Sequence, residues 1–167
     1  MRPIARLGTE LLVAGIGQVA IGVAGLVAGL LLADSAARAL VPWVVAALAL
    51  GGVSVLTSRW LRDAEPGDAD PAARVETTGL TVRRTSVTLA LAAVAVAVAA
   101  VLGGALAAVL GGVVTGVGAV DLVNRAWVAR REGETGLALY RELGPSPFSS
   151  GRRPLYTRPR KDITLAT

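Results

Sequence analysis

The segment Val87–Val120, VTLALAAVAVAVAAVLGGALAAVLGGVVTGVGAV, contains 34 consecutive residues without a charge. As one α-helix it would be about 51 Å long at 1.5 Å per residue, whereas the hydrocarbon core of a bilayer is about 30 Å thick. Fitting it would need a tilt beyond the roughly 0–40° of membrane helices. The segment therefore predicts two spans joined near Gly103 and Gly104, since glycine tolerates the positive φ of tight turns.

Two further apolar runs precede this segment. The first, 11–33, is interrupted only by Gln18, and the second, 40–58, has Trp43 near its start and Trp60 just beyond its end. Each run is long enough to cross a bilayer, and tryptophans at both ends of a run are typical of membrane interfaces. A signal peptide is the alternative for the first run, but its apolar region would be only about 7–15 residues long. The sequence thus predicts an all-α integral membrane bundle of two helical hairpins, with spans at 11–33, 40–58, 85–102 and 105–123.

The composition favours a membrane protein without catalytic chemistry. Hydrophobic residues make up 53% of the chain and charged residues 17%, compared with about 25% charged residues in soluble domains. There is no cysteine and no histidine, so the commonest general base and the commonest zinc ligands are absent. We therefore expect neither an enzyme nor a bound cofactor or metal. Sixteen of the seventeen basic residues are arginine, which with abundant Ala, Val and Gly is typical of high-GC bacterial coding.

The positive charges predict the orientation of the chain. Two lie in 1–10, one in 34–39, five in 59–84 and nine from residue 121 onward. With four spans, sixteen of the seventeen lie on one side, and the excess of Lys and Arg in cytoplasmic segments assigns that side to the cytoplasm. With three spans, the nine-charge tail would lie outside. We expect a protein of the bacterial cytoplasmic membrane with a cytoplasmic N-terminus (1–10), loop (59–84) and tail (124–167).

The segments outside the membrane have weaker patterns. Val75–Val82 is rich in β-branched residues and predicts either a small hairpin or a flexible loop. Glu134–Leu143, followed by Gly-Pro, predicts a short amphipathic helix, and the chain from 145 to 161 is expected to be extended. The tail carries a basic cluster suited to anionic lipid headgroups or a partner protein: Arg152, Arg153, Arg158, Arg160 and Lys161. Because most arginines flank apolar runs instead of sharing one face, nucleic-acid binding is not expected.

Small residues recur at helical spacing in the first and fourth spans. In lipid, helix association depends on close backbone approach, which small residues permit. Glycines recur every seven residues from Gly15 in the first span, which also contains a GxxxG pair, and small residues recur every four from Gly104 in the fourth. The partner helix could belong to this chain or to another subunit. The predicted packing residues are Gly15, Gln18, Gly22, Gly25, Gly29, Gly104, Ala108, Gly111 and Gly112.

A few polar residues lie within or beside the spans. Gln18 could contact a substrate or ion, but an interhelical hydrogen bond worth about 0.6–2 kcal/mol is favoured. Thr115 and Ser54 are expected to bond carbonyls of their own helices. Asp121 and Asn124 form a possible polar site; because Asp121 lies near the predicted interface, a solvated or Arg-paired carboxylate is favoured over a proton-transfer site.

The expected function follows from two features of the sequence: it has small-residue faces for helix packing, and it has no recognisable catalytic motif. The leading hypothesis is a non-catalytic accessory or scaffold subunit of a larger bacterial membrane complex, in contact with lipids and with other membrane subunits or copies of itself. The alternative is a self-assembling pore or small transporter, similar to a holin, with Gln18, Thr115 or Asp121 near the path. An enzyme would require Glu10, Asp121 and arginines around one cavity.

Overall fold

The computed structural model describes residues 3–70, 73–143 and 153–159. The described chain is mostly helical, and four helices are long and apolar enough to cross a membrane, which confirms the predicted number of candidate spans. The helices are α1 (Leu7–Leu32), α2 (Ala36–Asp63), α3 (Thr78–Leu102) and α4 (Gly104–Thr135). The strands are β1 (Ile4–Arg6), β2 (Gly67–Asp68), β3 (Leu137–Glu142) and β4 (Leu155–Pro159).

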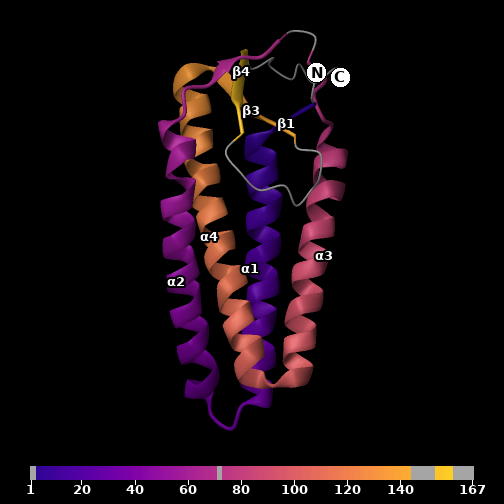
Figure 1. Ribbon diagram of the computed structural model, residues 1–167, viewed down its shortest axis with the longest axis vertical. Coiled ribbons are helices and arrows are strands. Elements are labelled where there is room, and N and C mark those ends of the chain that lie inside the picture. Colours follow the sequence, from indigo (N-terminus) through magenta and orange to yellow (C-terminus); the bar gives the residue numbers. More distant parts are fainter. Residues whose placement is uncertain (1–2, 71–72, 144–152, 160–167) are drawn as a thin grey trace, which may run out of the picture.

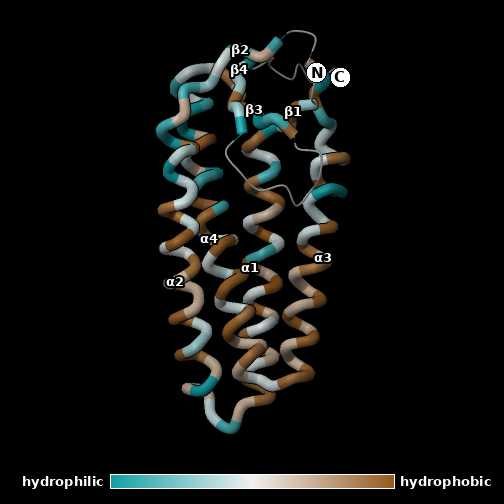
Figure 2. Tube along the Cα trace, in the orientation of Figure 1, coloured by the Kyte–Doolittle hydropathy of each residue, from teal (hydrophilic) through white to brown (hydrophobic). Residues whose placement is uncertain are grey.

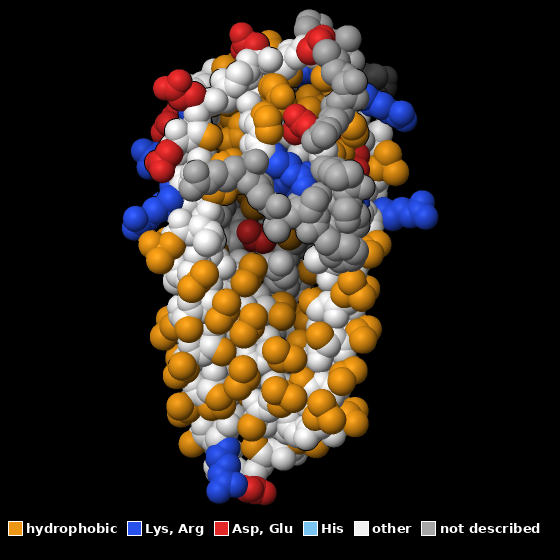
Figure 3. Space-filling model, in the orientation of Figure 1, with side chains coloured by type: hydrophobic (Ala, Val, Ile, Leu, Met, Phe, Trp, Pro, Cys, Tyr) orange, Lys and Arg blue, Asp and Glu red, His pale blue; other side chains and the backbone are white. Residues whose placement is uncertain are grey.

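The molecule has two unlike ends (Figure 1). All four strands gather at the end where α1 and α3 begin and α2 and α4 finish, which we call the capped end. The opposite turn end holds only the short connections Ala33–Ser35 and Gly103. Hydrophobic residues dominate the helices between the two ends, whereas charged side chains are concentrated at the ends themselves (Figures 2 and 3). This banded surface is the one expected of a protein solvated by hydrocarbon along its middle.

The helices form a row in which consecutive helices are joined by short turns but do not make the most extensive contacts. The most extensive contact joins α1 to α4, the first helix to the last, while α2 packs mainly on α4 and α3 mainly on α1. Consecutive helices α1 and α2 share only a small contact. Accordingly, α2 and α3 lie on opposite sides of the central α1/α4 pair (Figure 1). Short connections bring α1 and α2 together at the turn end, but side-chain size decides which helices pack closely.

Glycine determines the central contact. A Cβ built on Gly25 would lie 2.9 Å from the carbonyl oxygen of Ala107, and one on Gly111 would lie 2.6 Å from that of Gly22. Real Cβ atoms do not approach backbone this closely, so both positions require glycine. The remaining predicted glycines of the first span also face α4, which places their packing partner within the same chain. A second glycine face of α4, at Gly112 and Gly116, contacts the backbone of α2 in the same way.

The turn between α3 and α4 is a single residue. Gly103 caps the end of α3 and the start of α4 with φ = 152°. Residues other than glycine rarely adopt this backbone conformation. Its neighbour Gly104 packs against α1, where an added Cβ would lie 2.9 Å from the Cβ of Leu32. The two consecutive glycines therefore have different roles: Gly103 allows the turn, and Gly104 allows the close contact with α1.

A small sheet covers the capped end, so the expectation of an all-α fold is wrong for this part of the chain. The strand order is β1-β3-β4-β2: β3 pairs antiparallel with β1 and with β4, and β2 pairs parallel with β4. The N-terminal segment, the connection between α2 and α3 and the C-terminal region thus join in one structure. Residues 153–159 of the tail that was expected to be extended are described, and within them Leu155–Pro159 forms a strand of this sheet.

Two local predictions near the sheet are also wrong. Glu134–Leu143 does not form a separate helix: α4 continues to Thr135, Gly136 ends it with φ = 68°, and Leu137–Glu142 is a strand. Val75–Val82 forms neither the small hairpin nor the flexible loop expected of it, because Val75 makes one bridge to Ile4 and α3 begins at Thr78, capped by the Thr77 hydroxyl. In both segments, pairing with distant strands or capping of a helix outweighs the local pattern.

A hydrophobic core fixes the sheet on the helix ends. Side chains from α1, α2, α4 and both long strands form it: Leu7, Leu61, Val128, Leu139 and Leu155. Beside this core, Glu132 of α4 is only 4% exposed. Its carboxylate accepts the Leu139 amide at 2.9 Å and pairs with Arg6 at 3.4 Å. One buried side chain thereby connects α4 with β3 and β1.

Candidate functional site

A partly open cavity of about 590 Å³ lies at the capped end between α1, α2 and α4, and Arg141 of β3 also lines it. Its apolar wall consists of Leu7, Leu11, Trp60, Leu61, Val117 and Val120. Its polar wall consists of Ser54, Thr57, Ser58, Asp121, Asn124 and Arg141. This volume falls in the range of roughly 300–1,000 Å³ that small-molecule sites occupy, and we call it the interhelical cavity.

The two residues predicted as a polar site, Asp121 and Asn124, both line the interhelical cavity. Asn124 is only 2% exposed, and its amide oxygen has no hydrogen-bond partner among the described residues. Within the same part of the structure, Asp121 makes neither a hydrogen bond nor an ion pair. Asp121 is also the first charged residue after the apolar stretch of α4. The cavity therefore contains two polar groups whose hydrogen-bonding capacity is not used within the described chain.

The hydroxyl groups of α2 face the cavity from the opposite side. The Thr57 hydroxyl donates to the carbonyl of Val53 at 3.0 Å, and the Ser58 hydroxyl donates to that of Val55 at 3.2 Å. With their protons committed to the helix, both oxygens remain available only as acceptors. Asp121, the carboxylate of the described lining, shares the cavity with these hydroxyl groups.

An ion-pair cluster lies beside the cavity and joins three separate parts of the chain. The Glu10 carboxylate of α1 accepts from Arg84 of α3 at 3.2 Å and from Arg141 of β3 at 2.5 Å. Arg84 also pairs with Glu76 at 3.4 Å, and Glu76 accepts the Thr81 hydroxyl at 2.8 Å. The side chains of Glu10 and Glu76 are only about one-tenth exposed. Breaking such a buried pair leaves an uncompensated charge, so the cluster holds α3 and β3 against α1.

A smaller cavity of about 150 Å³ lies on the other side of α1, against α3. Glu10, Gln18 and Arg84 line it together with two threonines. The Gln18 amide oxygen has no partner among the described residues, so the interhelical hydrogen bond expected of this side chain is not formed. Thr115, in contrast, donates to Gly111 of its own helix at 2.9 Å, as predicted. A polar space of this size is sufficient for a few water molecules.

Glu10, Asp121 and arginines around one cavity were the set expected of an enzyme, and the structure brings only some of them together. Asp121 and Arg141 share the interhelical cavity, but Glu10 lines the smaller cavity and its carboxylate is bound by two guanidinium groups. Both guanidinium groups bind the Oε1 atom of Glu10, whereas Oε2 has no hydrogen-bond partner among the described residues. Asp121 makes no ion pair in the same part of the chain. The contributions of Arg84 and Arg141 could not be found from sequence, because nothing local distinguishes them from the other arginines.

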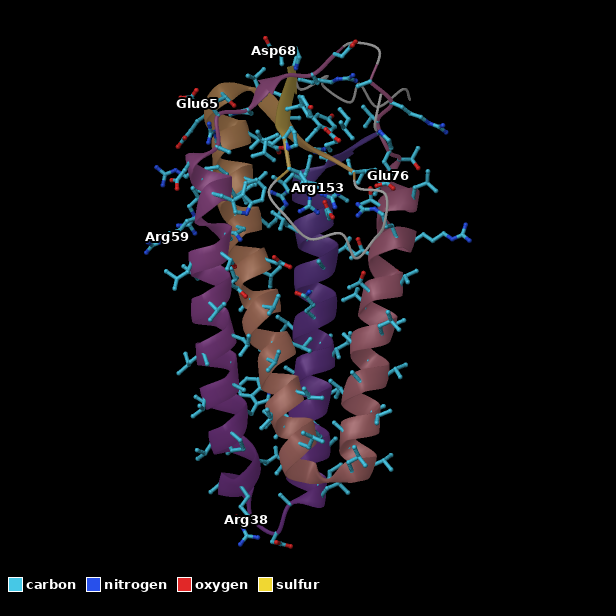
Figure 4. The ribbon with its side chains drawn as sticks, viewed as in Figure 1. Arg38, Arg59, Glu65, Asp68, Glu76 and Arg153 are labelled. Carbon is cyan, nitrogen blue, oxygen red and sulfur yellow. The ribbon has the colours of Figure 1, made fainter. Side chains whose placement is uncertain are left out.

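The predicted basic cluster of the tail falls partly within the described chain. Arg153 donates to the carbonyl of Glu142 at 3.4 Å, and Arg158 donates to the carbonyl of Ala73 at 3.0 Å. Both side chains therefore join the tail to other parts of the cap. Figure 4 places Arg153 at the capped end together with Arg59, whereas Arg38 lies at the turn end. Arg152, Arg160 and Lys161 lie outside the described residues.

The four apolar helices define the class of protein as a multi-pass membrane protein. Comparison with protein-family models, with curated proteins and with solved structures gave no match for this chain. Its function has therefore to be inferred from the row of helices, the cap and the cavity.

Proposed function

We propose that the protein is a non-catalytic accessory or scaffold subunit of a larger membrane protein complex, residing in the bacterial cytoplasmic membrane with its capped end in the cytoplasm. The row arrangement of the helices is the observation that supports it. Only 11% of the most apolar 18 residues of α2 and 17% of those of α3 are buried within the protein, against 22% for α1 and 39% for α4. Two of the four helices thus present most of their surface to the bilayer and to neighbouring subunits.

The difference between the surfaces of the central and outer helices supports the same proposal. The small-residue faces of α1 and α4 are occupied by contacts within the chain, so the central pair forms a rigid unit of its own. Large aliphatic side chains cover the outer helices, including Leu48 of α2, which is 72% exposed, and Val94 of α3, which is 58% exposed. In lipid, such surfaces associate by shape and van der Waals contact. A partner subunit would pack on these outer faces.

Site-specific photocrosslinking in intact membranes tests this role. A photoreactive amino acid at Leu48 or Val94 should give discrete crosslinks to the same membrane protein in repeated experiments. The matched control is the same amino acid at Trp127, an aromatic side chain that packs against the hydrophobic core of the cap and should crosslink mainly within the chain. If both outer positions yield only lipid adducts, the scaffold role is wrong.

The interhelical cavity supports a second candidate, a small transporter or self-assembling pore. Asp121 and Asn124 offer polar contacts at the edge of the membrane region, and such residues commonly mark solute pathways. The tight glycine contact leaves no path between α1 and α4 themselves, so a pore would require several copies of the chain. Purified protein in liposomes would have to release solutes faster than empty liposomes do; equal rates for a broad set of ions and small solutes exclude this candidate.

A further inference from the structure

An open groove of about 730 Å³ lies at the capped end, where the last turns of α2 meet the segment that leads into β4. Leu56 contributes an apolar side chain to its lining. The charged side chains of its described lining are Arg59, Asp63, Glu65 and Arg153. We call this space the α2–β4 groove. Of its described lining, only Trp60 is shared with the interhelical cavity, so the two spaces are separate.

The side chains of the α2–β4 groove follow a fixed order along α2. Leu56, which is 59% exposed, is the last exposed large hydrophobic residue of this helix. Arg59 and Asp63 follow it at spacings of three and four residues, so the three side chains lie on one face. At 1.5 Å per residue, Arg59 lies about 4.5 Å and Asp63 about 10 Å beyond Leu56. Glu65 also lies farther from the apolar middle than Arg59 (Figure 4). From the membrane outward, the groove is therefore apolar, then basic, then acidic.

The charged groups of the groove are balanced in number and accessible to a ligand. Arg59, Asp63 and Glu65 are exposed, and their side chains make no hydrogen bond or ion pair within the described chain. Arg153 donates to the carbonyl of Glu142 at 3.4 Å, which holds its guanidinium group at the groove. Two arginines and two acids give the described lining a formal charge of zero. A direct pair between the exposed Arg59 and Asp63 would contribute little to stability, so it would compete only weakly with a ligand.

A zwitterionic phospholipid has the same order of groups, since its acyl chains are followed by a phosphate and then by an ammonium group. We propose that the α2–β4 groove binds such a lipid, with its phosphate at Arg59 and Arg153, its ammonium at Asp63 and Glu65, and its acyl chains beside Leu56. Guanidinium groups match the geometry of phosphate, and carboxylates accept the N–H groups of an ammonium. This inference is independent of the proposed scaffold role.

Competition between two lipids with identical acyl chains tests the proposal. The full-length protein in mild detergent is incubated with equal concentrations of dioleoyl phosphatidylethanolamine and dioleoyl phosphatidylglycerol, and the bound lipids are measured by native mass spectrometry. Phosphatidylethanolamine should be retained at least about threefold more than phosphatidylglycerol, as expected for exposed charge pairs. Asp63→Asn combined with Glu65→Gln leaves the two arginines in place, so it should abolish or reverse this preference. Glu134→Gln, which removes an exposed carboxylate near the end of α4, should leave the preference unchanged.

A second variant tests the phosphate contact separately. Arg59→Gln should reduce the retention of both lipids, because both carry the phosphate group. The three substituted side chains are exposed, so the variants should fold, and an unchanged melting temperature in detergent checks this. Equal retention of the two lipids by the native protein would overturn the proposal, and so would a preference that the Asp63 and Glu65 double variant leaves unchanged. Stronger retention of phosphatidylglycerol by the native protein would also overturn it, since the groove would then act only as a basic patch.

Discussion

A Cβ atom on Gly22 of α1 would overlap the side-chain hydroxyl of Thr115 on α4, because the two backbones are in direct contact at this point. The same Cβ would lie 2.7 Å from the Thr115 amide nitrogen. Thr115 donates its hydroxyl proton to Gly111 of its own helix, so its position is fixed by α4 and it cannot move aside freely. This contact lies at the centre of the row, and the strength of the α1/α4 pair depends on it.

Gly22→Ala should therefore destabilise the protein by about 1–3 kcal/mol, the usual cost of inserting a methyl group into a packed contact. Reversible unfolding in mixed micelles measures this change. Gly52→Ala is the matched control, since a Cβ on Gly52 of α2 meets nothing within 4 Å. It should be neutral or stabilise α2 by up to about 1 kcal/mol. Equal stability of the Gly22 variant and the native protein would contradict the described helix contact.

Removal of Glu10 should loosen the capped end. Glu10→Gln leaves Arg84 and Arg141 without their shared carboxylate, and loss of one partner of a buried ion pair costs about 3 kcal/mol. The same unfolding measurement checks the prediction. Asp34→Asn provides the comparison, because it removes an acid whose side chain is 85% exposed and paired with Arg38 at the turn end; exposed pairs contribute about 0–1 kcal/mol. If the two variants lose the same stability, the cluster does not hold the cap.

Glu132 should control the local stability of β3. Glu132→Leu removes the acceptor of the Leu139 amide and the partner of Arg6, so amide hydrogen exchange across Leu137–Glu142 should accelerate at least about tenfold, corresponding to roughly 1.4 kcal/mol. Glu132→Gln keeps an acceptor oxygen and should have a smaller effect. Exchange in the middle of α3, distant from the sheet, should be unchanged in both variants. Unaltered exchange in β3 of the leucine variant would be inconsistent with this role.

Reporter fusions should place the capped end in the cytoplasm. Among the described basic residues, Arg38 lies at the turn end and the others lie toward the capped end, and positively charged segments are retained in the cytoplasm. A fluorescent protein fused after Thr167 should fluoresce, because it would lie in the cytoplasm. Alkaline phosphatase inserted between Asp34 and Ser35 should be active, because that connection would lie in the periplasm. The reverse pattern of the two reporters would invert the proposed orientation.

The apolar helices could be predicted because their signal is local. A stretch such as Val87–Val120 has no charge and exceeds the bilayer thickness, so its length alone requires a reversal, and the reversal occurs at Gly103 as expected. The prediction failed where the chain leaves the apolar region. Leu137–Glu142 has residues that also suit a helix, and its strand conformation depends on pairing with Ile4–Arg6, more than 130 positions earlier in the sequence.

Local sequence patterns were enough to predict the number of candidate spans, the glycine faces and the segregation of charge, since each depends on residues close together in the chain. The three-dimensional structure was needed to find that the first helix packs on the last, that three separate segments form one sheet, and that Asp121 lines a cavity while Glu10 pairs with two arginines. These relationships arise from contacts between residues distant in sequence. The energy of each such contact depends on the distance and orientation of the two groups, which a local sequence pattern does not specify.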